Sequence, residues 1–326
     1  IRYRSPSRGL GDVYKRQQIA SGPISKGINL LPQIKAGRTF DLTKIIEGMK
    51  LMLWGMFMKV VLADRIAIYA NTVLDNYEYQ NGISCFIASF CYTIQIYGDF
   101  AGYSLLAIGC GKIMGFDLPN NFNRPYFAAT ITEFWRRWHI SLTQWLTSYV
   151  YIPLGGNRCS KARCYMNIFI TFLISGLWHG ANWTFIFWGW LHGMFQVIEK
   201  ITGLNSTPKN KWEKIFRISL TFLIINFAWI AFRMPTISDT FAIYNKIFTN
   251  FNGTLFLPGD KTTIVFIMFA LLLLLFKEIT DEYFPDSFKI MNSNYTVVRW
   301  IGYVSMIVII MLLGVFDAGQ FIYVSF

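Results

Sequence analysis

The three histidines of this chain are the side chains best suited to proton transfer, and all of them lie within residues 134–193. His139 falls in FWRRWHISLTQWL, His179 in SGLWHGANW and His192 in GWLHG. His179 stands out because residues 165–198 contain no Lys, Arg, Asp or Glu. An ionisable side chain in such an apolar run is costly at membrane depth, which makes it a candidate functional group.

General base catalysis is the chemistry that these histidines suit best. No G-x-S-x-G motif is present, so the nucleophile elbow of many hydrolases is not indicated. No H-E-x-x-H motif occurs and no carboxylate cluster accompanies the histidines, so we predict no metal site. A neutral imidazole in apolar surroundings resists protonation and can take the proton of a hydroxyl that attacks a thioester. The alternative is a purely structural histidine that joins two helices; it is weakest for His179 and strongest for His192.

Asp99 is a second costly residue, placed between Gly98 and Gly102 in an otherwise apolar run. It suits either a functional site or a junction at which small residues let helices approach and the aspartate caps a helix start. Both interpretations stay open on the sequence alone.

Composition predicts a membrane protein. Hydrophobic residues make up 54% of the chain and charged residues only 15%, against roughly 25% charged in soluble domains. Several apolar stretches approach the roughly 20 residues needed to cross a bilayer. We therefore predict an all-α, polytopic transmembrane helical protein.

The net charge of +12 is consistent with that class. Nucleic-acid binding would gather the basic residues in a soluble domain or arm. Here they lie mostly in loops between apolar segments, as the positive-inside bias predicts. We expect no nucleic-acid partner.

Local signals predict the helices that position these residues. Asp41 to Thr43 can cap a helix that continues to residue 74, and Thr130 or Thr132 can cap an amphipathic interfacial helix that reaches Leu146. The other apolar segments expected to be helical are 82–97, resumed at 100–110, then 218–232, 264–276 and 301–315.

The segment 165–198 is expected to enter the membrane and return. Basic residues precede it at Arg158, Lys161 and Arg163, and more lie within 199–217, so both ends are assigned to the cytoplasm. Each half is rather short for a full span, which favours a hairpin or a broken helix pair with WHGAN at its turn.

Domain organisation is expected to be simple. Residues 1–17 are basic and polar, unlike the apolar remainder of the chain, so we interpret them as a non-native or disordered leader. Residues 18–326 are expected to form a single membrane-embedded domain whose first membrane helices are missing.

Several long motifs resemble one family. They are YGDFAGYSLLAIG from Tyr97, GFDLPNNFNRPYFAATITEFWRRWHISLTQWL from Gly115, YIPLGGNR from Tyr151, and NIFITFLISGLWHGANWTFIFWGWLHG from Asn167. In this order they resemble the bacterial branch of the membrane-bound O-acyltransferase family, which contains alginate O-acetyltransferases and teichoic-acid D-alanyltransferases. The resemblance implies a ring of tilted helices around a central funnel, with His179 catalytic and His139 a second important histidine. Leu105 and Leu106 depart from the branch, which commonly has an acidic residue there.

The resemblance also implies a reaction. It is transfer of an acyl group, with acetyl preferred, from a cytoplasmic thioester to a hydroxyl of an extracytoplasmic polysaccharide or relay protein. The donor would be acetyl-CoA or an acyl carrier protein thioester, acting as substrate with no bound cofactor. It also implies a second extracytoplasmic acyltransferase as a partner, and a location in the inner or plasma membrane. Candidate donor- and substrate-binding residues are Asn121, Arg124, Trp135, Arg136, Trp138, Asp99 and Asn182.

Other functions stay open. Arg124, Arg136 and Arg137 suit phosphate groups of a donor, but equally lipid headgroups. D-alanyl transfer to teichoic acid is the nearest alternative reaction. A non-catalytic membrane scaffold and a transporter are the alternatives from other classes, although the transporter would require two related halves that the sequence does not show.

Overall fold

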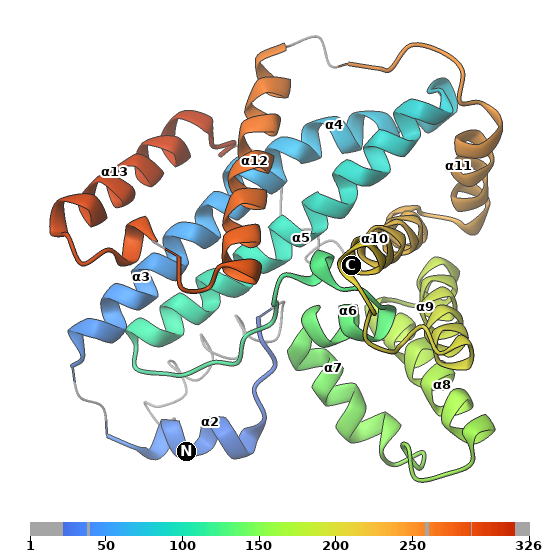
Figure 1. The fold of residues 1–326 in the computed structure, drawn as a ribbon, viewed down its shortest axis with the longest axis horizontal. Helices are drawn as coiled ribbons and strands as arrows, with labels where there is room; N and C mark the ends of the chain where they lie inside the picture. The colour runs from blue at the N-terminus through green and yellow to red at the C-terminus, as the bar shows by residue number, and fades with distance from the viewer. Residues whose placement is uncertain (1–21, 38–39, 258–260, 288, 317–326) are drawn as a thin grey trace, which may run out of the picture. The chain divides into compact units, whose positions relative to one another are not determined.

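The computed structural model describes residues 22–37, 40–257, 261–287 and 289–316, and every regular element within them is a helix (Figure 1). The predicted all-helical class is thus confirmed; the predicted leader, residues 1–17, lies outside the described residues. Three of the described helices are long and apolar enough to cross a membrane: α10 (Lys211–Arg233), α12 (Lys261–Tyr283) and α13 (Thr296–Leu313). They coincide with three of the segments predicted to be apolar helices.

The chain divides into two compact units. Of the described residues, the first combines those between 22 and 65 with 96–121 and those between 266 and 316. The second combines 66–95 with 122–265 and contains all three histidines.

The first unit is built on a long, locally irregular helix. α2 (Gly27–Lys35) precedes α3 (Leu42–Met56), which passes through a π-helix, η1 (Phe57–Ala63), into the first residues of α4 (Asp64–Leu74); the rest of α4 belongs to the second unit. Asp41 caps α3 as predicted, because its carboxylate accepts from the backbone N–H groups of Thr43 and Lys44 at 2.9 and 3.3 Å. The π-helix was not predicted; such segments are frequent at functional sites.

Asp99 does not start a helix, so the capping interpretation is wrong. α5 (Gly82–Ile113) runs unbroken through this position. The Asp99 side chain is buried, and its carboxylate lies 2.5 Å from Nζ of Lys59, which also lies 2.8 Å from Asp64. A cation supplied by η1 compensates the buried carboxylate, which explains why the aspartate is tolerated inside the helix.

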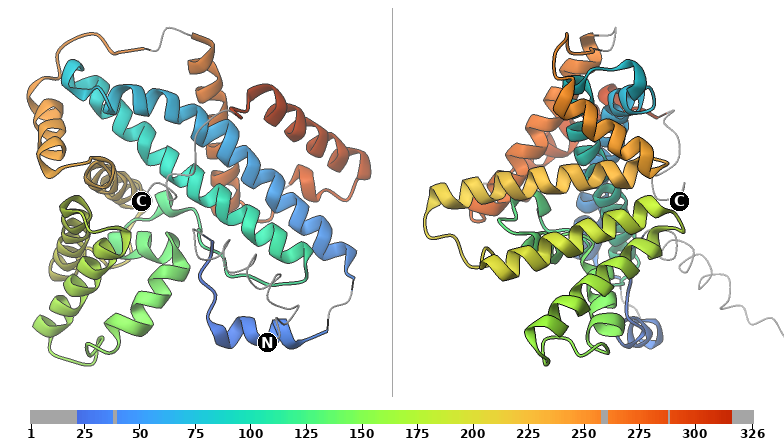
Figure 2. Two further views of the ribbon diagram at one scale, coloured as in Figure 1. Left: turned by 180° about the vertical axis from the view of Figure 1, so that it is seen from behind. Right: turned by 90° about the vertical axis from the view of Figure 1, so that its right-hand side faces the viewer.

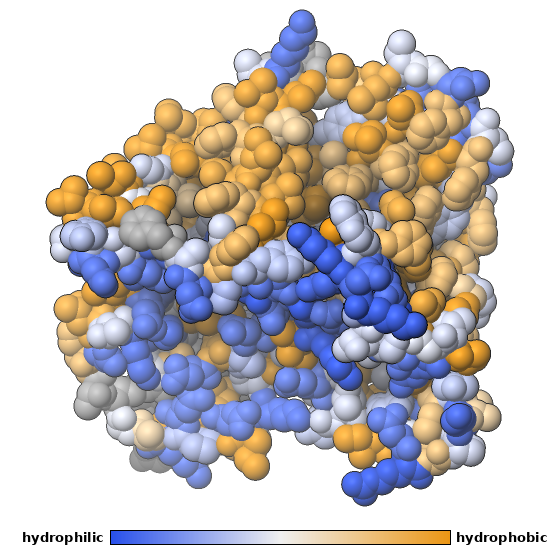
Figure 3. All heavy atoms as spheres, viewed as in Figure 1, coloured by the Kyte–Doolittle hydropathy of each residue, from blue (hydrophilic) through white to orange (hydrophobic). Residues whose placement is uncertain are grey.

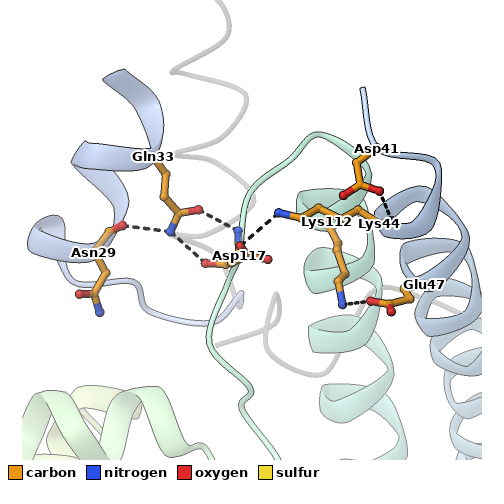
Figure 4. Close-up of polar contacts among 7 residues, drawn as sticks. All are labelled: Asn29, Gln33, Asp41, Lys44, Glu47, Lys112 and Asp117. Carbon is orange, nitrogen blue, oxygen red and sulfur yellow. Dashed lines mark hydrogen bonds and ion pairs between the residues drawn. The ribbon is translucent and has the colours of Figure 1, made fainter. Parts of the chain in front are cut away.

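Polar contacts tie together the ends of α2, α3 and α5 (Figure 4). Lys112 pairs with Glu47, and Lys44 lies 3.5 Å from Asp117. The amide of Gln33 donates to the carbonyl of Asp117 and accepts from its N–H at 3.2 and 2.8 Å. The loop after α5 is thus held by α2 and α3.

The outer surfaces of α12 and α13 are strongly apolar. Figure 3 shows hydrophobic side chains gathered over these two helices. Their exposed residues include Leu272, Met311 and Leu312. An exposed apolar surface of this kind indicates contact with lipid or with protein, and the length and hydropathy of both helices favour lipid.

The second unit contains the helices that carry the histidines. The helices of this unit are η2 (Tyr77–Tyr79), η3 (Pro125–Phe127), α6 (Ile131–Arg137), α7 (Ile140–Leu146), the π-helix η4 (Thr147–Tyr151), α8 (Lys161–His179), α9 (Trp183–Thr202), α10 and α11 (Ile237–Thr249). α9 packs against both α8 and α10 (Figure 2). The unit also includes the first part of α5.

α8 and α9 form the predicted hairpin, with its turn at residues 180–182. A Cβ atom on Gly176 would overlap the carbonyl oxygen of Phe185, and one on Gly189 would overlap that of Phe172. The two helices therefore approach backbone to backbone, which only glycine allows at these positions. The arms have 19 and 20 residues, so they are longer than the sequence indicated.

The predicted interfacial helix is not continuous. Thr130 caps α6 as expected, accepting from Glu133 N–H at 2.9 Å, but the helix ends at Arg137. Trp138 is extended, and His139 adopts the left-handed conformation with φ 42° and ψ 53°. The hydrophobic spacing did not predict this break, since spacing reports which faces are buried and not the backbone angles of one residue.

Candidate active site

His179 is the last residue of α8 and stands at the hairpin turn. Its half-buried ring is surrounded by aromatic rings from two other helices. The ring centroids of Trp188 and Phe185 on α9 lie 5.3 and 6.4 Å away, and that of Phe232 on α10 lies 5.1 Å away. The predicted base thus sits at the junction of three helix ends, in a largely apolar environment.

His139 lies near His179 even though the two come from separate motifs. It occupies the break between α6 and α7 and is only 7% exposed. Burial lowers the pKa of His139 well below its ordinary value, and the nearby His179 lowers that pKa further. His139 is therefore neutral near pH 7, the form in which an imidazole accepts a proton. The structure brings together the two histidines predicted to be catalytic.

Glu199 holds the helix that leads to His139. Its carboxylate accepts from the backbone N–H groups of Ile131 and Thr132 at 2.7 and 3.0 Å, and from the Thr132 hydroxyl at 2.8 Å. These N–H groups belong to the first turn of α6, where a negative charge is favoured. Glu199 thereby anchors α6 on α9 and sets the position of the break that carries His139.

His192 contacts the same aromatic cluster from α9. Its Nδ1 accepts from the indole N–H of Trp135 at 3.3 Å, so in the neutral ring the proton is on Nε2. Trp188 lies next to both His192 and His179, with ring centroids 4.9 and 5.3 Å away. Trp135, predicted to bind substrate, is here a partner of a buried histidine.

The sequence reasoning missed this cluster around Trp188. Among the residues described, the buried Nε2 of His192 and indole nitrogens of Trp188 and Trp229 have no hydrogen-bond partner. The spacing of Trp188 and His192, four residues apart on one helix, was the available signal. The contribution of Trp229 from α10 had no local signal at all.

Trp138 occupies a packing position. It is fully buried against Phe134, Phe122 and Trp229, with ring centroids 5.5, 5.0 and 5.0 Å away. Its role in substrate binding stays a prediction, and its burial shows that it also fills the core beside His139.

The predicted phosphate-binding arginines differ in exposure. Arg136 is exposed on the last turn of α6, whereas Arg137 pairs with Glu133 at 2.7 Å. Arg124 adopts the left-handed conformation with φ 45°, and its carbonyl accepts from Arg137 at 3.5 Å. Arg136 is thus the one most available to a ligand from solvent.

Asn182 caps α9, accepting from Thr184 N–H at 3.1 Å, and donates to the carbonyl of Pro235 at 2.9 Å. It ties the hairpin turn to the segment after α10. The last two predicted residues belong to the first unit: Asp99 pairs with Lys59, and the buried Asn121 donates to the Ser104 hydroxyl at 3.3 Å.

Metal chemistry finds no support in the side chains that can be placed. Within the part of the chain that the structure describes, no group of three or more His, Cys, Asp or Glu residues is close enough to hold an ion.

Known proteins share this arrangement of motifs. Residues 45–236, which include His139 and His179, match the model of the membrane-bound O-acyltransferase family. A probable alginate O-acetylase of Pseudomonas syringae is 42% identical over 231 residues, covering 71% of this chain and 44% of that protein. A peptidoglycan O-acetyltransferase of Helicobacter pylori is 39% identical over 230 residues, covering 69% and 44%. A teichoic acid D-alanyltransferase of Streptococcus thermophilus is 29% identical over 242 residues, covering 65% and 58%. The chain thus spans less than half the length of the first two relatives.

Proposed function

Because this chain belongs to the membrane-bound O-acyltransferase family, we propose that it transfers an acyl group, acetyl in preference to others, from a thioester to a hydroxyl. The observation that carries the proposal is that the buried His139 lies near His179, at the end of the α8–α9 hairpin. Two imidazoles in apolar surroundings suit proton transfer from an alcohol. The names of the relatives at about 40% identity, an alginate and a peptidoglycan O-acetyltransferase, favour acetyl and a glycan.

The reaction needs no covalent enzyme intermediate. The acceptor hydroxyl gives its proton to His179 while its oxygen attacks the thioester carbonyl carbon, forming a C–O bond and a tetrahedral oxyanion. The C–S bond then breaks, the carbonyl re-forms, and the leaving thiolate takes the proton from His179. His139 orients one of the reactants or assists the proton transfer.

The lengths of the hairpin arms and the charges at their ends support a donor and an acceptor on opposite sides of the membrane. Its arms of 19 and 20 residues are about 30 Å long, close to the thickness of the hydrocarbon core. The basic residues Arg158, Lys161 and Arg163 precede α8, or lie in its first turn, and residues 209–217 after α9 are again basic. By the positive-inside rule these ends face the cytoplasm, and the turn with His179 faces away from it.

We therefore place the thioester donor, acetyl-CoA or an acyl carrier protein, on the cytoplasmic side of the inner or plasma membrane. The exposed basic side chains Arg158, Lys161 and Arg163 at this end of the hairpin are suited to its phosphate groups. The acceptor is a hydroxyl of an extracytoplasmic glycan, or of a second acyltransferase that passes the acetyl group to it.

The test replaces His179 by glutamine in the full-length gene in its own host. Trp178→Phe is the matched control, because Trp178 is the exposed neighbour of His179 on the same helix. Ester-linked acetyl on the envelope and on secreted glycan is released with mild base and quantified, with protein amount checked by immunoblot. We expect His179→Gln to remove the ester at wild-type protein level, and Trp178→Phe to retain it.

Three other outcomes contradict parts of the proposal. If the amount of ester-linked acetyl is unchanged in both the His179→Gln variant and a deletion strain, the proposed glycan acetylation is refuted, and D-alanyl transfer or transport is favoured. Loss in the deletion strain but not in His179→Gln favours a scaffold. Equal loss in His179→Gln and Trp178→Phe assigns the effect to the fold of the hairpin.

A further inference from the structure

A pocket of about 400 Å³ lies beside the hairpin turn, within the second unit. We call it the turn pocket; its lining includes Asp75, Tyr77, Asn182, Phe185, Phe232 and Arg233. Its volume is within the range of small-molecule sites, roughly 300–1,000 Å³. Of the site residues predicted from the sequence, Asn182 is the one that lines this pocket.

The polar side of the turn pocket is an arginine–carboxylate pair. Nη2 of Arg233 lies 2.6 Å from the Asp75 carboxylate and donates to Asn71 at 3.1 Å. The guanidinium has five N–H donors, and those on Nε and Nη1 have no acceptor among the residues described. The Asp75 side chain is 55% exposed, which leaves it free to accept further hydrogen bonds. The pair therefore presents donors and acceptors next to one another.

The apolar side of the turn pocket separates it from His179. Phe185 and Phe232 both line the pocket, and their ring centroids are 5.0 Å apart. The same two rings lie 6.4 and 5.1 Å from the ring of His179. A molecule in the pocket is thus one side chain away from the proposed base.

The remaining polar groups hold the rim in place. The Tyr77 hydroxyl donates to Asp239 at 2.8 Å, and the Asn182 amide donates to the carbonyl of Pro235 at 2.9 Å. Because these groups are already engaged, Arg233 and Asp75 are the ones that can recognise a ligand.

We propose that the turn pocket binds a sugar ring of the acceptor, an inference that rests on the proposed acyl transfer. A sugar ring combines an apolar C–H face, which packs on aromatic rings, with vicinal hydroxyls that both donate and accept. Arg233 and Asp75 match the hydroxyls, and Phe185 and Phe232 match the C–H face.

The donor does not fit this pocket. Phosphate groups of coenzyme A or an acyl carrier protein require an excess of positive charge, and Asp75 already neutralises Arg233. The basic residues Lys161 and Arg163 lie at the other end of α8, Lys161 about 27 Å along the helix from His179. Because the charges of Arg233 and Asp75 balance, the turn pocket favours an uncharged, hydroxyl-rich ligand.

The experiment measures binding of an uncharged trisaccharide of hexose units to the full-length protein in detergent, by titration calorimetry. The variants are Arg233→Gln and Asp75→Asn. Arg217→Gln is the matched control: it removes an arginine from the opposite end of α10 that is also paired with a carboxylate, that of Glu213. Gel filtration and thermal unfolding check the fold of each variant.

We expect saturable binding to wild type, weakened at least tenfold by Arg233→Gln and by Asp75→Asn and unchanged by Arg217→Gln. His179→Gln should bind the sugar like wild type while losing acyl transfer, which separates this proposal from the proposed function. Absence of saturable binding to wild type, or wild-type affinity in a folded Arg233→Gln or Asp75→Asn variant, overturns the assignment.

Discussion

Replacing Glu199 by glutamine tests whether a single buried carboxylate positions the catalytic region. Glu199 is 8% exposed, and its two oxygens receive three hydrogen bonds from the first turn of α6. Glutamine keeps one acceptor oxygen, which can retain the N–H of Ile131. Its NH₂ group faces the N–H of Thr132, so that donor loses its acceptor.

The cost of Glu199→Gln is set by these contacts. Leaving one buried N–H unsatisfied costs about 1–3 kcal/mol, and removing the partly buried charge from a helix N-terminus costs up to about 2 kcal/mol. We expect the first turn of α6 to lose about 2–4 kcal/mol of local stability. Since a factor of ten corresponds to about 1.4 kcal/mol, the exchange protection of this turn should fall about 30-fold or more.

The assay is amide hydrogen exchange with mass spectrometry on the protein in nanodiscs, followed over peptides that cover α6 and α9. Lys200→Gln is the control: it removes a charge from the residue next to Glu199, in the last turn of α9, and should cost less than about 1 kcal/mol. The rate of acyl transfer should fall together with the exchange protection of α6. The reason is that α6 ends at Arg137, directly before the extended Trp138 and the break at His139. Unchanged protection at residues 131–132 in Glu199→Gln refutes the anchoring role, and unchanged transfer despite lost protection refutes its link to catalysis.

Three further predictions concern packing, buried charge and pH. Gly189→Ala should lower stability by about 1–3 kcal/mol, because the new methyl group forces α8 and α9 apart; thermal unfolding checks this against the exposed Gly37→Ala, which should be neutral. Lys59→Met should cost roughly 3–5 kcal/mol, because it leaves two buried carboxylates without their shared cation. Adding Asp99→Asn should then restore part of the loss, and a double variant no more stable than the single one contradicts this account. Burial depresses the pKa of His139 in the folded protein. The stability that comes from keeping this ring neutral is therefore complete above the pKa of histidine in the unfolded chain, about 6.5, and is lost as pH falls below that value. The unfolding temperature of wild type should therefore drop more steeply than that of His139→Gln between pH 7 and 5, and parallel curves contradict the assignment.

Local signals in the sequence predict the features that depend on nearby residues. Asp41 and Thr130 cap α3 and α6, because a cap needs only a side chain and the N–H groups two or three residues ahead. Apolar length predicts α10, α12 and α13. The charge pattern around 165–198 predicts the hairpin, since its two basic ends require an even number of crossings.

Signals of that kind fail where the partner is distant in the chain. The glycines around Asp99 are compatible with a cap, but Lys59 from another helix compensates its charge inside α5. The spacing within 130–146 is that of a continuous helix, yet Trp138 leaves the helical path to pack against Trp229 of α10. That spacing carries no information about Trp229.

Composition, segment length and contiguous motifs are sufficient to establish the class of this protein, its family and the two histidines that the family motifs single out. The packing of the helices was needed to show that His139 lies near His179 and that Glu199 anchors α6. It was also needed to show that Asp75 and Arg233 form the polar side of a pocket behind Phe185 and Phe232. These contacts join residues from different helices, so their geometry arises only when the helices pack, and no local pattern in the chain encodes it.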